Sequence, residues 1–304
     1  MTRYRGRFAP SPTGPLHFGS LVAATGSYLD ARHQQGEWLL RIEDLDPPRE
    51  IAGASDSIIR TLEQLGMAWD GPISYQSQRS HIYEEALDRL WQLGCLYDCG
   101  CSRKEIADTA VVTEAGPVYP GTCRNGLPPG RRPRSVRVRV DSAICSVRDR
   151  LQAPLQQQLA SEVGDFIVRR TDRLFSYQLA VVADDAGQQI SDVVRGADLL
   201  DSTPRQMYLQ GLLGLPTPSY LHLPVAVDHK LAKLSKQSFA QPVTPDDRHS
   251  AVIDVLRFLR QELPDSPHDA SSDELWQWAI EHWDVTPLPA CRTLPAPAQY
   301  FEPS

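Results

Sequence analysis

The first forty residues of this chain contain a proline-rich turn between a strand and a helix. Residues 4–8 predict a short strand, and residues 18–35 carry apolar side chains at helical spacing before Gly36. Between them, residues 9–15 include three prolines and one glycine, which exclude regular structure there. Residues 38–42 predict a second, buried strand. This succession is a βαβ unit, and it predicts an α/β fold built on a parallel, doubly wound sheet.

The turn places His17 and Gly19 at the N-terminus of the predicted helix. The first N–H groups of a helix are unpaired and its dipole is positive at that end, so a phosphate can bind there. Gly19 lacks a Cβ atom, which lets a base or a ribose approach the backbone. Glu43 follows the second strand, and ligands of such sheets bind beyond the carboxyl ends of the strands. The turn therefore predicts a ligand site, with an ordinary turn carrying a surface histidine as the alternative.

The remainder of the chain continues this alternation and is interrupted by one irregular segment. Helices are predicted over residues 55–65, 80–93, 204–213, 252–263 and 272–283, and strands over residues 166–170, 175–183, 190–194 and 223–227. Residues 95–155 are rich in glycine, proline and arginine, which predicts an inserted subdomain. Repeated prolines near the end predict an extended tail that packs loosely or not at all.

Residues 135–140 of the insertion alternate between one valine face and one arginine face. Arg131, Arg132 and Arg134 directly precede them, which makes this the densest basic stretch of the chain. Two interpretations have equal weight. The stretch is either an edge strand kept soluble by its charges or a contact for an RNA backbone.

The overall charge limits the classes of partner. A formal net charge of −7 argues against a protein that coats nucleic acid indiscriminately. No apolar run approaches the length of a membrane span and no signal-peptide core is present, so we expect a cytoplasmic protein without membrane contact. Only four of the 31 basic residues are lysines, and three of these four, Lys230, Lys233 and Lys236, fall within seven residues. This clustering predicts a mobile positive charge at one place in the chain, with chance clustering as the alternative.

The six cysteines also suggest a local site. In a cytoplasmic chain of this size they indicate metal ligands or bystander thiols, not a disulfide framework. Cys95, Cys99, Cys101 and Cys123 lie close enough in sequence to be considered together. Three thiolates suit zinc, which takes four tetrahedral ligands in structural sites.

Two short motifs carry a family resemblance. The sequence His17-Phe18-Gly19-Ser20, followed some 216 positions later by Lys233-Leu234-Ser235-Lys236-Gln237, resembles the two signature sequences of class I aminoacyl-tRNA synthetases. The resemblance implies ATP with Mg²⁺ as a substrate and His17, Gly19, Lys233 and Lys236 as catalytic residues. His17, Gly19, Ser20 and Lys236 would contact ATP, with His17 and Lys236 stabilising the charge that develops on the α-phosphate from opposite sides. Gln237 stands where the family usually has serine, and Ser20 where a second histidine is common.

Further stretches extend the resemblance to the glutamyl branch of this family, over roughly residues 3 to 240. They are residues 7–14, 40–46, 175–182 and 194–201. The resemblance implies that Arg7 and Arg195 hold the carboxylates of L-glutamate and that Glu43 binds its ammonium group. Ser11 would add a hydrogen bond within the stretch Arg7, Phe8, Ala9, Pro10 and Ser11, and Tyr177 would line the pocket. The alternatives are structural ion pairs of Arg7 and Arg195 with Glu43 or Asp198, and a core role for Tyr177.

The resemblance also specifies a zinc site and a domain plan. Short glutamyl-type members suggest Cys99, Cys101, Tyr119 and Cys123 as ligands of one structural Zn²⁺, with Cys95 or His81 as the alternative fourth ligand and free thiols as the alternative to a metal. Residues 1–94 and 156–240 would form two halves of a Rossmann-like catalytic domain. Residues 95–155 would be the zinc-containing insertion that contacts the acceptor, and residues 241–304 a short helical region with a proline-rich tail.

The acceptor of the activated amino acid follows from what is missing. Only 67 residues follow Gln237 in this chain of 304 residues, too few for the anticodon-binding region of a full glutamyl enzyme. The chain therefore most resembles the short members that activate glutamate without tRNA and esterify it to the queuosine base in the anticodon loop of tRNA(Asp), and a monomer is expected. The alternatives are a short synthetase that charges tRNA(Glu), an activator of glutamate for a non-tRNA acceptor, and a non-catalytic binder.

Overall fold

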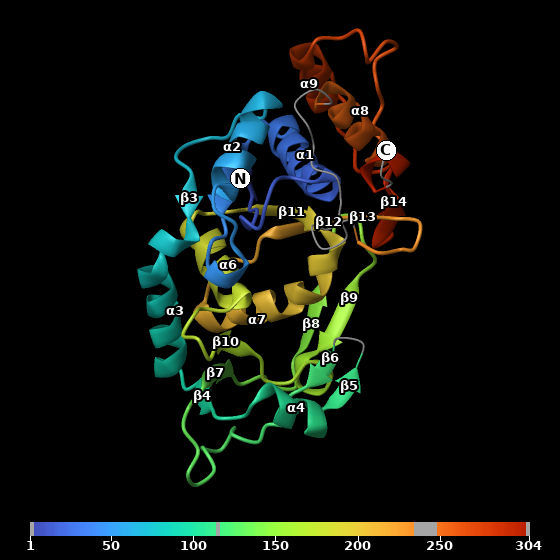
Figure 1. The fold of residues 1–304 in the computed structure, drawn as a ribbon. Helices are drawn as coiled ribbons and strands as arrows, with labels where there is room; N and C mark the ends of the chain where they lie inside the picture. Colours follow the sequence, from blue (N-terminus) through green and yellow to red (C-terminus); the bar gives the residue numbers. More distant parts are fainter. Residues whose placement is uncertain (1–2, 114–115, 234–247, 302–304) are drawn as a thin grey trace.

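Parallel strands from the two ends of the predicted catalytic region form the centre of the molecule (Figure 1). The computed structural model describes residues 3–113, 116–233 and 248–301. In it, β1 (Arg5–Phe8) pairs in parallel with β2 (Glu37–Ile42), and β2 with β3 (Ser74–Tyr75). β11 (Asp192–Gly196) pairs in parallel with β12 (Ser219–Leu223). The N–H of Ser191 donates to the carbonyl of Arg5 at 3.0 Å, which places β11 beside β1. The predicted α/β class is confirmed.

Helices cover both faces of these strands, and the two faces differ in chemistry. Alternate side chains such as Trp38 and Leu40 enter the main apolar core, which they share with α1 (Phe18–His33), α2 (Ala54–Gln64), α8 (Arg248–Phe258) and α9 (Ser272–Glu281). The intervening side chains face α6 (Tyr177–Gly187) and α7 (Thr203–Leu213), and among them are buried Arg7, Arg41 and Arg195. One side of the strands is therefore an ordinary core, and the other is a buried polar layer.

The close packing of α1 on the strands depends on Gly26. A Cβ atom at this position would lie 2.3 Å from Cδ1 of Leu223, so any larger residue would require the buried Leu223 side chain to shift.

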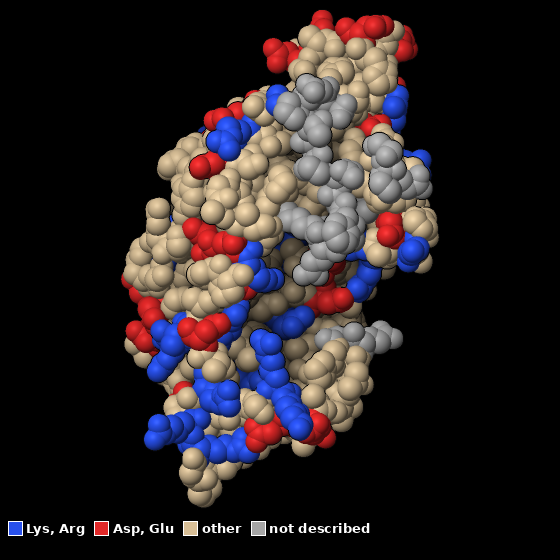
Figure 2. Space-filling view, in the orientation of Figure 1, with Lys and Arg blue, Asp and Glu red and all other residues tan. Residues whose placement is uncertain are grey.

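The elements between residues 80 and 169 form and flank a small antiparallel sheet at the opposite end of the molecule from α8 and α9 (Figure 1). They are α3 (Ser80–Gln92), β4 (Leu96–Cys99), α4 (Arg103–Thr109), β5 (Val111–Thr113), β6 (Gly116–Val118), β7 (Ser135–Val138), β8 (Ile144–Val147), β9 (Leu155–Gln158), α5 (Leu159–Glu162) and β10 (Ile167–Arg169). On the face shown in Figure 2, Lys and Arg side chains gather over this end of the molecule.

The interpretation of residues 135–140 as an edge strand is wrong, because β7 is the central strand between β4 and β10. Arg137 does not belong to an exposed arginine face either. It is buried, its guanidinium lies 3.8 Å from the centre of the Tyr119 ring, and it donates to the carbonyl of Asp165 at 2.6 Å. The structure therefore removes Arg137 from the set of residues that could contact RNA.

Two further predictions are wrong. Residues 175–183 are not a strand, because all but the first two belong to α6, whose N-cap Ser176 accepts a hydrogen bond from the N–H of Leu179. An apolar run buried on every side has no period that separates helix from strand. The tail is not loosely packed: β14 (Thr293–Pro295) pairs in parallel with β13 (Val225–Val227), and buried Tyr300 stacks on Phe18 with ring centres 4.2 Å apart.

No helix in the described part of the chain is long and apolar enough to cross a membrane.

Candidate active site

A cavity of about 820 Å³ opens at the carboxyl ends of β1, β2 and β11, beside the N-terminus of α1. Figure 2 shows it as a hollow in the middle of the molecule. Twelve of the predicted site residues line this one cavity: Arg7, Phe8, Ala9, Pro10, Ser11, His17, Gly19, Ser20, Glu43, Tyr177, Arg195 and Lys233. Lys236, the remaining predicted catalytic residue, lies outside the described residues.

His17 is the N-cap of α1, as the sequence predicts. Its Nδ1 accepts a hydrogen bond from the N–H of Ser20 at 3.2 Å, and the Ser20 hydroxyl lies 3.0 Å from its Nε2. The first turn of α1 contains no acidic residue, so no carboxylate there neutralises the positive end of the helix dipole. The geometry suits an anionic group at this end of the cavity.

Arg195 reaches the cavity from β11 and is held by neutral groups. Its side chain donates from Nε to His222 Nε2 at 3.0 Å, from Nη2 to Thr203 Oγ1 at 2.8 Å, and from Nη1 to the Tyr177 hydroxyl at 3.3 Å. Arg195 is only 5% exposed, yet no carboxylate of the described residues forms an ion pair with it. The alternative pairing with Asp198 is not found, because Asp198 pairs with Lys233.

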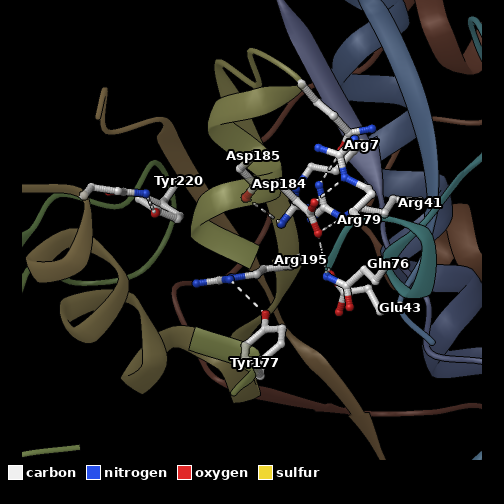
Figure 3. A network of polar contacts seen from close by, with 12 residues as sticks. Arg7, Arg41, Glu43, Gln76, Arg79, Tyr177, Asp184, Asp185, Arg195 and Tyr220 are labelled. Carbon is white, nitrogen blue, oxygen red and sulfur yellow. Dashed lines mark hydrogen bonds and ion pairs between the residues drawn. The ribbon is translucent and has the colours of Figure 1, made fainter. Parts of the chain in front are cut away.

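Arg7 has a carboxylate partner that the sequence analysis did not identify. Its Nε donates to Oδ1 of Asp185 at 3.1 Å, and Nη2 of Arg41 lies 2.8 Å from the same oxygen. Arg41 also donates to Glu43 at 3.4 Å, which connects Arg7 to Glu43 through Asp185 and Arg41 (Figure 3). Burial raises the pKa of Glu43, whereas the charges of Arg41 and Arg7 oppose that shift.

Asp184 extends the network away from the cavity. It accepts hydrogen bonds from Gln76 at 2.7 Å, Tyr83 at 2.8 Å and Arg79 at 2.5 Å. Three arginines and three carboxylates thus share one buried region (Figure 3). Two successive aspartates in an otherwise apolar segment were the available sequence signal, and they could be interpreted only once that segment was known to be helical.

The three cysteines of the insertion come together with a tyrosine. The sulfurs of Cys99, Cys101 and Cys123 lie within 4.8 Å of one another, with 3.6 Å between those of Cys101 and Cys123. The Tyr119 hydroxyl lies 3.4 Å from the Cys99 sulfur and 3.6 Å from that of Cys101. Two sulfurs bound at about 2.3 Å to one tetrahedral zinc ion are about 3.8 Å apart, so these spacings fit such an ion.

The ionisation of Cys99 agrees with this fit. Burial would raise the pKa of the thiol, but the hydrogen bonds with Tyr119, the backbone of Cys101 and Arg137, with the charge of Arg137, together outweigh burial and lower it. Neither alternative fourth ligand, Cys95 or His81, belongs to the group that the described residues form, and the Cys95 thiol lies 3.7 Å from the carbonyl of Leu93 instead.

The fold and the cavity define an α/β protein whose cavity opens at a helix N-terminus beside cationic side chains. A family profile described as "tRNA synthetases class I (E and Q), catalytic domain" matches residues 3–258. The chain belongs to this family.

The chain is similar over nearly its whole length to individual members of this family. The chain is 56% identical to a protein of Dechloromonas aromatica named "Glutamyl-Q tRNA(Asp) synthetase", over 96% of this chain and 99% of that protein. It is 51% identical to the protein of the same name from Aromatoleum aromaticum, over 98% of this chain and 94% of that protein. Among solved structures, a glutamate-tRNA synthetase from Elizabethkingia anophelis is 25% identical with a TM-score of 0.80, covering 98% of this chain and 69% of that chain.

Proposed function

We propose that this chain activates L-glutamate with ATP and Mg²⁺ to glutamyl-adenylate, without tRNA, and transfers the glutamate to the queuosine base of tRNA(Asp). Relatives at 56% and 51% identity over nearly their whole length bear the corresponding name. The observation that carries the amino-acid part is Arg195, a buried guanidinium that lines the cavity with no carboxylate partner among the described residues. A buried arginine without a counter-ion is costly, and a substrate carboxylate would supply one.

The glutamate pocket then has a role for each predicted residue. Arg195 and Tyr177 bind one carboxylate, since the Tyr177 hydroxyl already contacts Nη1 of Arg195. Arg7 binds the other carboxylate, and its own guanidinium is held in place by its hydrogen bond to Asp185. Glu43 receives the ammonium group, and Ser11 adds a hydrogen bond in the wall formed by Phe8, Ala9 and Pro10.

ATP would occupy the end of the cavity at the N-terminus of α1. His17, Gly19 and Ser20 line that end, and the helix dipole favours a phosphate there. Lys233, paired with Asp198, lines the same cavity. Together with Lys236 it would neutralise the charge that builds up as pyrophosphate leaves.

Zinc and the acceptor belong to the insertion in this proposal. Cys99, Cys101, Cys123 and Tyr119 would hold one structural Zn²⁺, which the spacings of their sulfur and oxygen atoms support. Residues 95–155 would contact the tRNA, between catalytic halves at residues 1–94 and 156–240, with residues 241–304 as a short helical region. A monomer remains the prediction for the oligomeric state.

The test is glutamate-dependent pyrophosphate exchange without tRNA, followed by transfer of labelled glutamate to queuosine-containing tRNA(Asp) and to tRNA(Glu). Exchange without tRNA and label on tRNA(Asp) alone are expected. Exchange that requires tRNA(Glu) would instead make the chain a short conventional synthetase, and no exchange under any condition would favour a non-catalytic binder.

A further inference from the structure

Asp149 and His222 form a fully buried pair behind Arg195. Asp149 lies in the loop between β8 and β9, and His222 lies on β12, directly opposite Arg195 of β11. Both side chains are 0% exposed, and Oδ2 of Asp149 lies 2.6 Å from Nδ1 of His222. The other oxygen, Oδ1, accepts from the N–H groups of Leu151 at 3.0 Å and Gln152 at 2.8 Å.

The surroundings of this pair fix the tautomer of the imidazole. Burial would raise the pKa of Asp149, but the hydrogen bond from His222 and those from the backbone outweigh it and lower the pKa. The carboxylate is therefore ionised and can only accept, so the imidazole hydrogen sits on Nδ1. Burial lowers the pKa of His222, which keeps the ring neutral and leaves a lone pair on Nε2.

That lone pair meets a group that can only donate. Nε of Arg195 lies 3.0 Å from Nε2 of His222, and Nη2 of Arg195 donates to Thr203 at 2.8 Å. These two bonds fix the plane of the guanidinium. Nη1 is then directed to the Tyr177 hydroxyl, to which it donates. The opposite tautomer would set an N–H of His222 against the N–H of Arg195 and remove this support.

We propose that Asp149 and His222 are positioning residues, which hold Arg195 in the orientation that binds a glutamate carboxylate. This inference rests on the proposed function, because it assigns the orientation of Arg195 to glutamate binding. It also gives the β8–β9 loop a part in the site: the loop joins β12 at a bridge between Asp149 and Tyr220 and supplies the carboxylate that sets the tautomer.

The first test replaces Asp149 by asparagine, which preserves shape but donates to Nδ1 and so moves the imidazole hydrogen to Nε2. We expect the KM for glutamate in pyrophosphate exchange to rise about 10- to 100-fold, as for the loss of a hydrogen bond to a buried charged group, while the KM for ATP stays unchanged. The matched control is Asp165→Asn, another buried aspartate, which accepts hydrogen bonds from Tyr97 and Val140; none of these three residues lines the cavity. Its KM for glutamate should equal that of the unmodified chain.

The second test separates positioning from simple stability. His222→Gln keeps an oxygen that can accept a hydrogen bond from Arg195, whereas His222→Leu has none. Calorimetry should therefore show tighter glutamate binding by His222→Gln than by His222→Leu. ¹⁵N NMR of the ring should show the hydrogen on Nδ1 in the unmodified chain and on Nε2 in Asp149→Asn.

The outcomes are distinguishable from failure of the proposed function. Absence of exchange in the unmodified chain refutes the proposed function itself. Normal exchange with an unchanged KM for glutamate in Asp149→Asn overturns the positioning role, and so does equal glutamate affinity of His222→Gln and His222→Leu.

Discussion

Replacing Asp185 by asparagine tests whether the polar layer beneath the cavity depends on one carboxylate. Asp185 lies 3.1 Å from Arg7 and 2.8 Å from Arg41, whose side chains are 4% and 0% exposed. Asparagine has the same shape and opens no cavity, so the loss is almost purely electrostatic. Removing one partner from a buried ion pair costs about 3–5 kcal/mol, because the remaining charge stays buried without compensation. We expect the free energy of unfolding to fall by that amount.

The assay is urea denaturation at pH 7, with Asp172→Asn as the matched control. Asp172 pairs with Arg170 but is 46% exposed, so its replacement should cost roughly 0–1 kcal/mol. The KM for glutamate should also rise in Asp185→Asn, since the Arg7 guanidinium loses the carboxylate that orients it toward the cavity. A loss below about 1 kcal/mol for Asp185→Asn, no larger than that of the control, would refute the reasoning.

The pH dependence of this difference has a defined sign. Burial alone would raise the pKa of Asp185, but Arg7 and Arg41 outweigh burial and lower it. The carboxylate therefore stabilises the folded chain fully above its unfolded-state pKa of about 3.9, and the contribution is lost as the pH falls from there through the folded-state pKa. The difference between Asp185→Asn and the unmodified chain should be constant from pH 5 to 7 and narrow only in stronger acid.

Three further predictions concern other parts of the molecule. Lys236→Ala should leave glutamate binding in calorimetry nearly intact and lower adenylate formation by orders of magnitude; equal losses of both would contradict its assigned role. A zinc chelator should release one equivalent of zinc from the unmodified chain and lower its melting temperature, and Cys123→Ser should lower both the zinc content and the melting temperature. Cys291→Ser, at a cysteine outside the cluster, should change neither. Tyr300→Ala should cost about 3 kcal/mol in urea denaturation because it removes a buried ring that stacks on Phe18, whereas Tyr300→Phe, which keeps the ring, should cost under about half of that.

The sequence determined the parts of this protein that depend on neighbouring residues. The turn that carries His17 and Gly19, the helix after it and the two flanking strands could be predicted, because proline, glycine and apolar spacing act within a few residues. The family resemblance of its motifs likewise predicted twelve residues that line one cavity. Their chemical roles remain predictions, since they depend on substrates.

The tertiary structure decided whatever depends on residues far apart in the chain. An apolar run could not show that residues 177–187 form a helix, because burial on all sides removes the period. The partners of Arg7 and Arg195 could not be predicted either, since Asp185 is 178 positions from Arg7 and Asp149 reaches His222 from the insertion. The same holds for Tyr300 on Phe18. Which buried charge meets which partner is a property of the assembled layers, because Coulomb and hydrogen-bond energies depend on distance in space and not on distance along the chain.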